Sequence, residues 1–218
     1  MAFADRAEAG ARLANALDDY QGEDVVVVGL PRGGVEVAFP IARHLDAPLT
    51  VVLIRKIGFP MHPELAMGAI VDGDEPITVK NEDVLRRGHI PKIIFDEVAQ
   101  RELAEIHRRQ KIYLRDRSSV PLEGRVVIIV DDGIATGATV RAAIAGIKAR
   151  KPRKIVLAVP VAAEDSLETI RAEVDEVICL EPLHRLGAIS LSYHHFPQLT
   201  DNDVIALLDA AERPSTPQ

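Results

Sequence analysis

The chain has 218 residues, and its 47% hydrophobic content is enough to fill one sizeable core. Its formal charge of −7 argues against a general nucleic-acid surface, because such surfaces are normally basic. No apolar run approaches the ~20 residues of a membrane span, and the first residues lack a signal-peptide core, so we expect a cytoplasmic protein. The only cysteine, Cys179, lies in an apolar run and is expected to be a buried, inert thiol.

Short apolar runs and helical patterns alternate along the chain. An amphipathic helical pattern over 3–17 is expected to cover one face of a sheet. The expected strands are 25–28, 49–54, 126–130, 155–161 and 174–180. The expected helices that follow or separate them are 35–45, 140–149, 163–172 and 204–211. This rhythm predicts an α/β fold in which helices cover both faces of a parallel sheet and ligands bind outside the carboxyl ends of the strands.

A glycine-containing loop follows the first expected strand, with the sequence Gly29-Leu30-Pro31-Arg32-Gly33-Gly34. Gly33 and Gly34 permit a ligand to approach the backbone closely, and Arg32 offers a planar fork of donors that suits phosphate oxygens. Taken alone, the loop is better explained as a plain glycine turn with a solvated arginine. Its expected position opposite the acid pair at 131–132 favours an anion site instead.

The region between the second and third expected strands interrupts the rhythm. Arg55 and Lys56 are expected at the carboxyl end of the second strand, where they either neutralise an anionic leaving group or are solvated. Residues 66–71 and 77–80 are expected to form a hairpin. Residues 91–117 are expected to form one long amphipathic helix, with an apolar stripe that is able to pack on a second subunit and an Arg-rich end that is expected to be a solvated face.

The most informative stretch covers residues 126–140, VVIIVDDGIATGATV. A buried strand is followed by Asp131 and Asp132, and a turn of small residues then enters a helix, whose free N–H groups form a ready anion site. The two acids would repel a phosphate, but they suit the hydroxyls of a sugar diol or a cation. A ribose 5-phosphate is the simplest ligand with both groups. The plain alternative is an ordinary strand-turn-helix in which an acid caps the turn.

This run resembles the phosphoribosyl pyrophosphate signature of type I phosphoribosyltransferases: an apolar strand, two acids, three variable residues and Thr-Gly-x-Thr. The loop at 31–33 is similar to the Ala-Arg-Gly with which adenine-specific members hold pyrophosphate. The order of elements matches over roughly 24–196. The resemblance implies an α/β, parallel-sheet type I (Rossmann-like) core with helices on both faces, a small hood and an inserted hairpin and long helix.

The implied organisation is one phosphoribosyltransferase-like domain over 1–213. Its core covers about 20–181, an insertion covers about 58–120, a C-terminal hood covers about 182–203, and 214–218 form a flexible tail. Part of the insertion corresponds in order to the mobile loop that closes over the site in the resembled enzymes.

The resemblance implies an Mg²⁺-dependent enzyme of nucleotide salvage. It would move the ribose 5-phosphate of phosphoribosyl pyrophosphate (PRPP) to a nitrogen acceptor, a nucleobase or related heterocycle, and release pyrophosphate. The chain looks most like family members whose acceptor is unassigned. The expected partners are PRPP and a small-molecule acceptor, with no membrane and no nucleic acid, and the expected assembly is a homodimer.

The resemblance also assigns roles to single residues. Asp131 and Asp132 would hold the 2- and 3-hydroxyls and, with Arg32, act as the catalytic residues; the two acids are also the candidate ligands of the metal, with no direct protein ligand certain. The residues expected at the 5-phosphate are Gly133, Ala135, Thr136, Gly137, Ala138 and Thr139. Those expected at the pyrophosphate are Pro31, Arg32, Gly33, Arg55 and Lys56.

The acceptor side departs from the purine-specific pattern. The expected pocket residues are Val161, Leu183, His184, Tyr193 and Phe196. Purine-salvage relatives carry an aromatic residue a few positions before a glycine, whereas residues 183–186 before Gly187 read Leu-His-Arg-Leu. Ala135 stands where hypoxanthine-guanine members have an aspartate, so any proton transfer is expected to involve a hood residue or water.

Two functions of other classes remain open. One is a non-catalytic sensor that binds PRPP or a nucleotide and regulates a partner or RNA through the Arg-rich end of the 91–117 helix. The other is a nucleotide hydrolase that uses the same sugar-phosphate site, which requires a general base that the signature does not supply.

Overall fold

A five-stranded parallel sheet forms the centre of the molecule. The computed structural model describes residues 2–59, 62–73, 76–115, 117, 120–184 and 187–213, with the side chains of 62–65 left out. The sheet consists of β1 (Val25–Gly29), β2 (Leu49–Val51), β6 (Val126–Val130), β7 (Lys154–Ala163) and β8 (Glu176–Leu183). Their order is β2-β1-β6-β7-β8, and every neighbouring pair is parallel. The expected α/β fold with a parallel sheet is confirmed.

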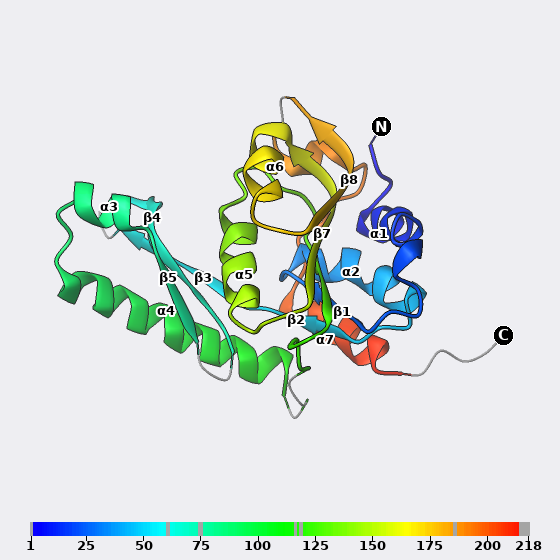
Figure 1. The fold of residues 1–218 in the computed structure, drawn as a ribbon, viewed down its shortest axis with the longest axis horizontal. Coiled ribbons are helices and arrows are strands. Elements are labelled where there is room, and N and C mark those ends of the chain that lie inside the picture. The colour runs from blue at the N-terminus through cyan, green and yellow to red at the C-terminus, as the bar shows by residue number, and fades with distance from the viewer. Residues whose placement is uncertain are drawn as a thin grey trace.

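Helices cover both faces of this sheet, as Figure 1 shows. Val25 and Val27 of β1 pack in one cluster with α1 (Arg6–Asn15) and α2 (Gly33–His44). Val26 and Val28 point to the other face, where they join the cluster that contains α5 (Ala138–Lys148) and α6 (Glu164–Arg171). Because both faces are covered, β1 and β6 are buried at every residue, which explains why their sequences are continuous apolar runs rather than alternating ones.

The strand order reverses between β1 and β6, which is the position at which open parallel sheets bind ligands. These two strands end level with each other, because Gly29 pairs with Val130 and each is the last residue of its strand. The loops that leave β1 and β6 therefore begin side by side.

The expected strand over 49–54 is divided in two, which corrects the position assigned to Arg55 and Lys56. β2 ends at Val51, and β3 (Ile54–Phe59) begins a second, antiparallel sheet with β4 (His62–Val71) and β5 (Ile77–Lys80). Buried Val52 and Leu53 connect the two sheets. The expected hairpin is present as β4 and β5, whereas Arg55 and Lys56 lie inside β3 and not at the end of a central strand.

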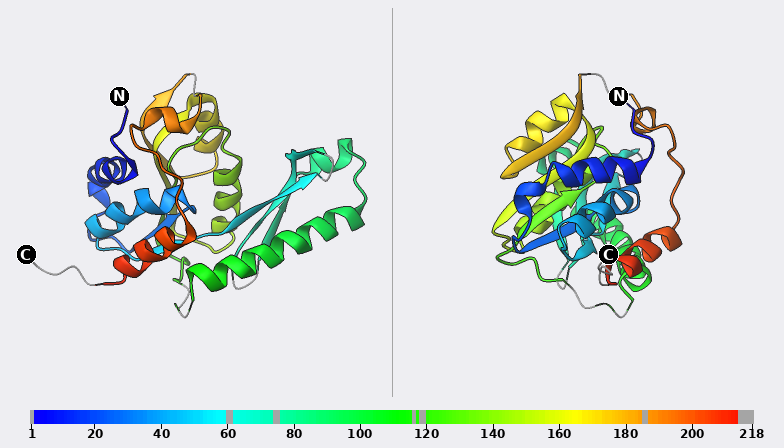
Figure 2. Two further views of the ribbon diagram at one scale, coloured as in Figure 1. Left: turned by 180° about the vertical axis from the view of Figure 1, so that it is seen from behind. Right: turned by 90° about the vertical axis from the view of Figure 1, so that its right-hand side faces the viewer.

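The second sheet forms an arm together with α3 (Glu82–Arg87) and α4 (Lys92–Tyr113), and this arm extends away from the core in Figures 1 and 2. The apolar stripe of α4 packs on the arm's own sheet. The residues of this cluster include Ile57, Met67, Ile70, Phe95, Val98 and Ile106. The stripe is therefore covered within the chain and does not require a second subunit.

Three contacts among the described residues help to attach the arm to the core. Val71 of β4 packs against Gly146 of α5, and Arg150 donates a hydrogen bond to the side chain of buried Asp72 over 3.2 Å. At the other end of α4, the Tyr113 hydroxyl donates to Asp201 over 2.5 Å, at the start of α7 (Asp201–Ala211). Burial and this bond raise the pKa of Tyr113 to about 12. These contacts join the arm to both α5 and α7.

The N-terminus and the segment after β8 form one structural unit. Phe3 and Tyr193 make a parallel β-bridge, and the His194 N–H donates to the Phe3 carbonyl over 2.8 Å. The chain then enters α1 at Arg6 and not at residue 3, because Asp5 caps the helix by accepting from the Glu8 N–H over 2.8 Å. A short 3-10 helix, Ile189–Ser192, precedes the bridge. The hood expected over about 182–203 overlaps the end of β8 and the start of α7, and from here on we use the name hood for residues 187–200 between them.

The helix expected over 91–117 ends four residues earlier, at Tyr113, and the other expected helices are present with ends shifted by at most three residues. The tail over 214–218 lies outside the described residues, as do 185 and 186 of the expected hood. Half-buried Cys179 has a pKa raised by burial to about 11, which agrees with an inert thiol. Within the described residues, no helix combines the length and the apolar character that crossing a bilayer requires.

The joint between the arm and α5 gives a first prediction. A Cβ at Gly146 would overlap Cγ1 of Val71 and lie 2.7 Å from its Cβ, and Val71 is fully buried. We expect Gly146→Ala to lower the free energy of unfolding by about 1–3 kcal/mol, despite the better helix propensity of alanine. Urea denaturation measures this loss.

Val71→Ala provides the control for this joint. It removes the two methyl groups that meet the new Cβ, so the double variant should lose less stability than the sum of the two single losses. Additive losses would mean that the two residues do not contact each other.

Candidate functional site

The loops that follow β1 and β6 make a very close contact at the carboxyl edge of the sheet. The Leu30 N–H donates to the Val130 carbonyl over 2.9 Å, and α2 begins three residues later, at Gly33. A Cβ at Gly33 would overlap Oδ2 of Asp132, and one at Gly34 would lie 2.5 Å from the Val130 oxygen. Glycine is required at both positions because the acid loop occupies the space of a side chain. The structure thus brings the predicted anion loop and the predicted acid pair together.

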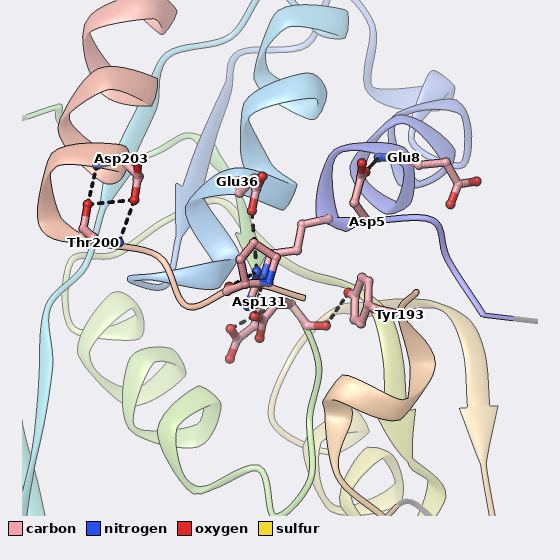
Figure 3. A network of polar contacts seen from close by, with 10 residues as sticks. Asp5, Glu8, Glu36, Asp131, Tyr193, Thr200 and Asp203 are labelled. Carbon is pink, nitrogen blue, oxygen red and sulfur yellow. Dashed lines mark hydrogen bonds and ion pairs between the residues drawn. The ribbon is translucent and has the colours of Figure 1, made fainter. Parts of the chain in front are cut away.

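Each acid has one oxygen bound within the protein. Oδ1 of Asp131 accepts from the Asp132 N–H over 2.9 Å, and Oδ2 of Asp132 accepts from Nε of Arg6 over 2.8 Å. Figure 3 shows this network where α1, α2 and the β6 loop meet. Among the described residues, the second oxygen of each carboxylate has no hydrogen bond. Two free acceptors, one from each acid, suit the two hydroxyls of a sugar diol.

The electrostatics of the site are dominated by carboxylates. Burial and the neighbouring charge of Asp132 raise the pKa of Asp131 well above its ordinary value, and Arg6 opposes this only in part. Burial also raises the pKa of Glu36, whose carboxylate lies 3.6 Å from Nη1 of Arg6. The acid pair therefore attracts cations and hydroxyl donors and repels phosphate.

Arg6 is the site residue that the sequence did not reveal. Only 5% of it is exposed, and it binds Asp132, 126 residues away in the sequence. Its guanidinium also donates to the Pro197 carbonyl over 2.9 Å and lies 3.6 Å above the ring of Phe196. An arginine in the first turn of an amphipathic helix is usually solvated, so no local pattern distinguishes it.

The loop from 133 to 139 is held in place below the acids. Ile134 bonds to β7 in both directions, accepting from Ala163 over 2.9 Å and donating to Val161 over 3.0 Å. Gly137 is the N-cap of α5 with φ 72°, and no side chain caps this helix. The N–H groups of its first turn are thus available to an anion. Thr136 and Thr139 are exposed beside them.

Arg32 directly precedes Gly33 in the loop that approaches Asp132. It is half-buried at the start of α2, and its side chain makes no hydrogen bond or ion pair with the other described residues. The Pro31–Arg32 peptide bond is cis. Arg55, by contrast, donates to Glu102 of α4 over 2.8 Å within the arm, while Lys56 is exposed on β3. The role of Arg32 as an anion donor therefore stays a prediction, whereas Arg55 lies in an ion pair within the arm.

The expected acceptor residues differ in burial, and four of the five belong to one apolar cluster. Val161 and Tyr193 are buried in a cluster with Phe3, and the Tyr193 hydroxyl donates to the Asp132 carbonyl over 2.6 Å. Burial, reinforced by Asp132, raises the pKa of Tyr193. These two residues support the acid loop from behind. The other three expected acceptor residues are half-buried Leu183, half-buried Phe196 under Arg6, and exposed His184, which is ion-paired to Glu164.

A cavity of about 560 Å³ lies at the opposite edge of the sheet, where β6, β7 and β8 begin. Two ion pairs line it: Arg153 pairs with Glu23, and Lys154 pairs with Glu176. The ligands of parallel sheets bind at the carboxyl edge, so this cavity is separate from the candidate site.

The acid pair also suits an Mg²⁺ ion that binds together with a phosphorylated ligand. Among the described residues, no group of three or more His, Cys, Asp or Glu side chains is arranged to hold a metal ion. Mg²⁺ binds commonly through one or two carboxylates together with substrate phosphates and water. The donor set of Asp131 and Asp132 therefore fits an ion that arrives with a phosphorylated ligand.

Comparison with known proteins agrees with this geometry. The family model of the phosphoribosyl transferase domain matches residues 4–194. The chain belongs to the phosphoribosyltransferase family. Two Mycobacterium tuberculosis proteins, from strains CDC 1551 and H37Rv and each named "Putative phosphoribosyl transferase", are 45% identical to it over 211 residues. These residues are 97% of this chain but 47% of each relative, so the chain spans about half the length of the curated relatives it matches.

A solved structure extends the likeness to the whole phosphoribosyltransferase fold. The protein TT1426 from Thermus thermophilus superimposes with a TM-score of 0.84 at 41% identity. The match covers 95% of this chain and 98% of TT1426, so it includes the arm as well as the core.

The contact between the two loops gives a second prediction. Gly33→Ala places a methyl group where Oδ2 of Asp132 lies, so we expect the Asp132–Arg6 pair to separate and the free energy of unfolding to fall by about 1–3 kcal/mol. Thermal unfolding and a crystal structure of the variant test this.

Gly187→Ala is the matched control. A Cβ there would lie 3.1 Å from the end of the flexible Leu191 side chain, and we expect a change below about 0.5 kcal/mol. Equal losses for both variants would contradict the special constraint at Gly33.

The raised pKa of Asp131 gives a third prediction. Because folding raises this pKa, the group favours the folded state most at pH values below the ordinary aspartate pKa, and this contribution is lost as pH rises through the folded-state value. Asp131→Asn is neutral at every pH. In metal-free buffer at pH 7 we expect it to be more stable than the unmodified protein, by an amount on the order of 1 kcal/mol.

This gain should shrink as the pH falls towards about 4. Urea denaturation of both proteins between pH 4 and 8 gives the comparison. A difference in stability that does not change over that range would rule out a strained carboxylate at position 131.

Proposed function

We propose that this chain transfers the ribose 5-phosphate of PRPP to a nitrogen acceptor and releases pyrophosphate, with Mg²⁺ as cofactor. The observation that supports the proposal is the close approach of Gly33 to Asp132, because the loop after β1, our proposed anion site, then lies beside the two acids that we propose as diol acceptors. PRPP carries a 5-phosphate, a 2,3-diol and a pyrophosphate around one ring. The three parts of the site offer a complementary group to each of them.

The donor end would be bound as follows. The first turn of α5 and the hydroxyls of Thr136 and Thr139 hold the 5-phosphate. The free oxygens of Asp131 and Asp132 accept hydrogen bonds from the two ring hydroxyls. Arg32 and the backbone at Gly33 receive the pyrophosphate. The ribose would thus be held over the junction of β1 and β6.

In the reaction, the bond between the anomeric carbon and the pyrophosphate oxygen breaks, and the electron pair leaves with pyrophosphate. A bond from the acceptor nitrogen to that carbon forms. Positive charge develops on the ribosyl ring, where the carboxylates of Asp131 and Asp132 stabilise it, and negative charge develops on the leaving group, where Arg32 stabilises it. Bound Mg²⁺ would supply further neutralisation of the pyrophosphate, with Asp131 and Asp132 as its candidate protein ligands.

The proton of the acceptor nitrogen needs a separate route. Ala135 has no side chain that accepts a proton, and the Tyr193 hydroxyl is committed to the Asp132 carbonyl. The proton would therefore pass to water or to a polar group of the hood. The acceptor class that we propose is a nucleobase or a related heterocycle, bound between the hood and the edge of the sheet.

The arginines near the C-terminal end of α4 and just beyond it do not favour the alternative of an RNA-binding sensor. Arg108 and Arg109 both bind Glu105, and Arg117 binds Asp209 and Glu212. These side chains stabilise α4 and its contact with α7. A catalytic function is supported better by the geometry of the acid pair.

The proposed function is tested first with the unmodified chain. We expect calorimetry to detect binding of PRPP in the presence of Mg²⁺, and a screen of heterocyclic bases to find pyrophosphate release with at least one of them. Binding without release from any base would indicate a sensor. The absence of binding would contradict the proposal.

The fourth prediction concerns the two acids in that assay. Asp131→Asn combined with Asp132→Asn should leave a folded protein and lower the turnover number at least about 10²-fold, because the ring charge loses its stabilising carboxylates. The matched control is Asp19→Asn with Glu23→Gln, which removes two acids at the opposite edge of the sheet and should leave turnover unchanged. Turnover retained by the first pair would refute the assigned role.

A further inference from the structure

Arg6 lies where four parts of the site meet. It belongs to the first turn of α1, and it contacts Asp132 on the β6 loop, Glu36 on α2, and Phe196 and Pro197 in the hood. A Cβ at Gly33 would also lie 2.9 Å from its Nε. With 5% exposure, the side chain is enclosed by these partners.

This environment fixes the guanidinium plane. The ring of Phe196 covers one face at 3.6 Å, the Pro197 carbonyl accepts from Nη1, and the Asp132 carboxylate accepts from Nε. An arginine held at several donors loses little further freedom and transmits its orientation to its partners. The hydrogen bond from Arg6 to Oδ2 consequently fixes the rotamer of Asp132. This also fixes the direction in which the other carboxylate oxygen points.

Arg6 also balances the charge of the acids around it. Asp131, Asp132 and Glu36 are three acids in a small volume, and Arg6 is the cation paired with two of them. Close, unpaired carboxylates would repel one another and take up protons, which would destroy their capacity to accept two hydroxyls. The arginine keeps Asp132 paired while leaving one of its oxygens for the diol.

We propose that Arg6 is a positioning residue for the diol site: it fixes Asp132 so that the acid pair selects a sugar with both a 2- and a 3-hydroxyl. The proposal rests on the proposed function, since it assigns the diol of the donor to the acid pair. It adds that the N-terminal helix and the hood contribute to donor recognition through this one side chain. Arg6 acts through Asp132 and does not itself touch the sugar.

The test compares two ligands that differ in one hydroxyl. Calorimetry gives the dissociation constants of ribose 5-phosphate and 2-deoxyribose 5-phosphate. The ratio of the second constant to the first measures how strongly the site prefers a sugar with the 2,3-diol. For the unmodified chain we expect at least about tenfold weaker binding of the deoxy sugar, the usual effect of losing a hydrogen bond to a charged group. For Arg6→Gln the ratio should fall towards one because ribose 5-phosphate binds less tightly, while binding of the deoxy sugar stays the same.

A second substitution and a matched control complete the design. Arg6→Lys keeps the charge but loses the fork, so its ratio should lie between those of the unmodified chain and Arg6→Gln. Arg12→Gln is the control: Arg12 is on the same helix, lies 4.6 Å from the Phe3 ring, and pairs with Glu8 and Glu181 instead of the site acids. Its ratio should equal that of the unmodified chain.

The outcomes separate this proposal from the proposed function. If the unmodified chain does not bind PRPP, the proposed function fails. If it binds PRPP but Arg6→Gln keeps the full ratio, or weakens both sugars equally, Arg6 is only structural and the inference is overturned. A ratio near one in the unmodified chain, or the failure of both Arg6 variants to fold by circular dichroism, overturns it as well.

Discussion

The contact between Gly33 and the carboxylate of Asp132 is the constraint on which the rest of the site depends. It requires β1 and β6 to be neighbours and to end level, which the parallel register of Gly29 with Val130 provides. It requires a helix to start immediately after the loop, so that α2 carries Glu36 beside the acids. It also forces the carboxylate outwards from the sheet, where Arg6 meets it. A side chain at position 33 would collide with the Asp132 carboxylate, whatever its polarity.

The parts that sequence predicted correctly are those set by local physics. The apolar run 126–130 is buried on both faces because helices cover both sides of the sheet, and the turn at Gly137 adopts a positive φ that suits glycine. Arg6 escaped prediction because its partner lies 126 residues away and its own helix looks like a surface helix. Arg55 was misplaced for a related reason: the apolar pattern continues through Val52 and Leu53 into a different sheet, and periodicity does not record which sheet a strand joins.

The arm shows how tertiary context changes the meaning of an amphipathic pattern. The stripe on α4 is consistent in sequence with either a subunit interface or an internal surface, and the three-stranded sheet supplies the internal one. The ion pairs along α4 are likewise formed within the chain, since Glu105 accepts hydrogen bonds from Arg108 and Arg109 of its own helix. Glu105 has a pKa lowered to about 2 by these bonds, yet as an exposed network it contributes little to stability. The firm attachments of the arm are instead the buried ones, at Gly146 and at Tyr113.

An acid pair of this type lowers the stability of the folded protein without ligand and strengthens the binding of a ligand that compensates its charge. The pKa of Asp131 is raised because burial and Asp132 both disfavour its charge, so the folded protein stores unfavourable free energy at the place where a ligand would relieve it. Two hydroxyl donors or a cation would compensate both carboxylates, and the bound state would then be favoured by more than the new contacts alone. Arg6 limits this strain to one of the two acids, because it compensates Asp132 permanently. The pair is thereby divided into a fixed acceptor and a strained one, and under the proposed function the strained one, Asp131, would gain most from a cationic ribosyl ring beside it.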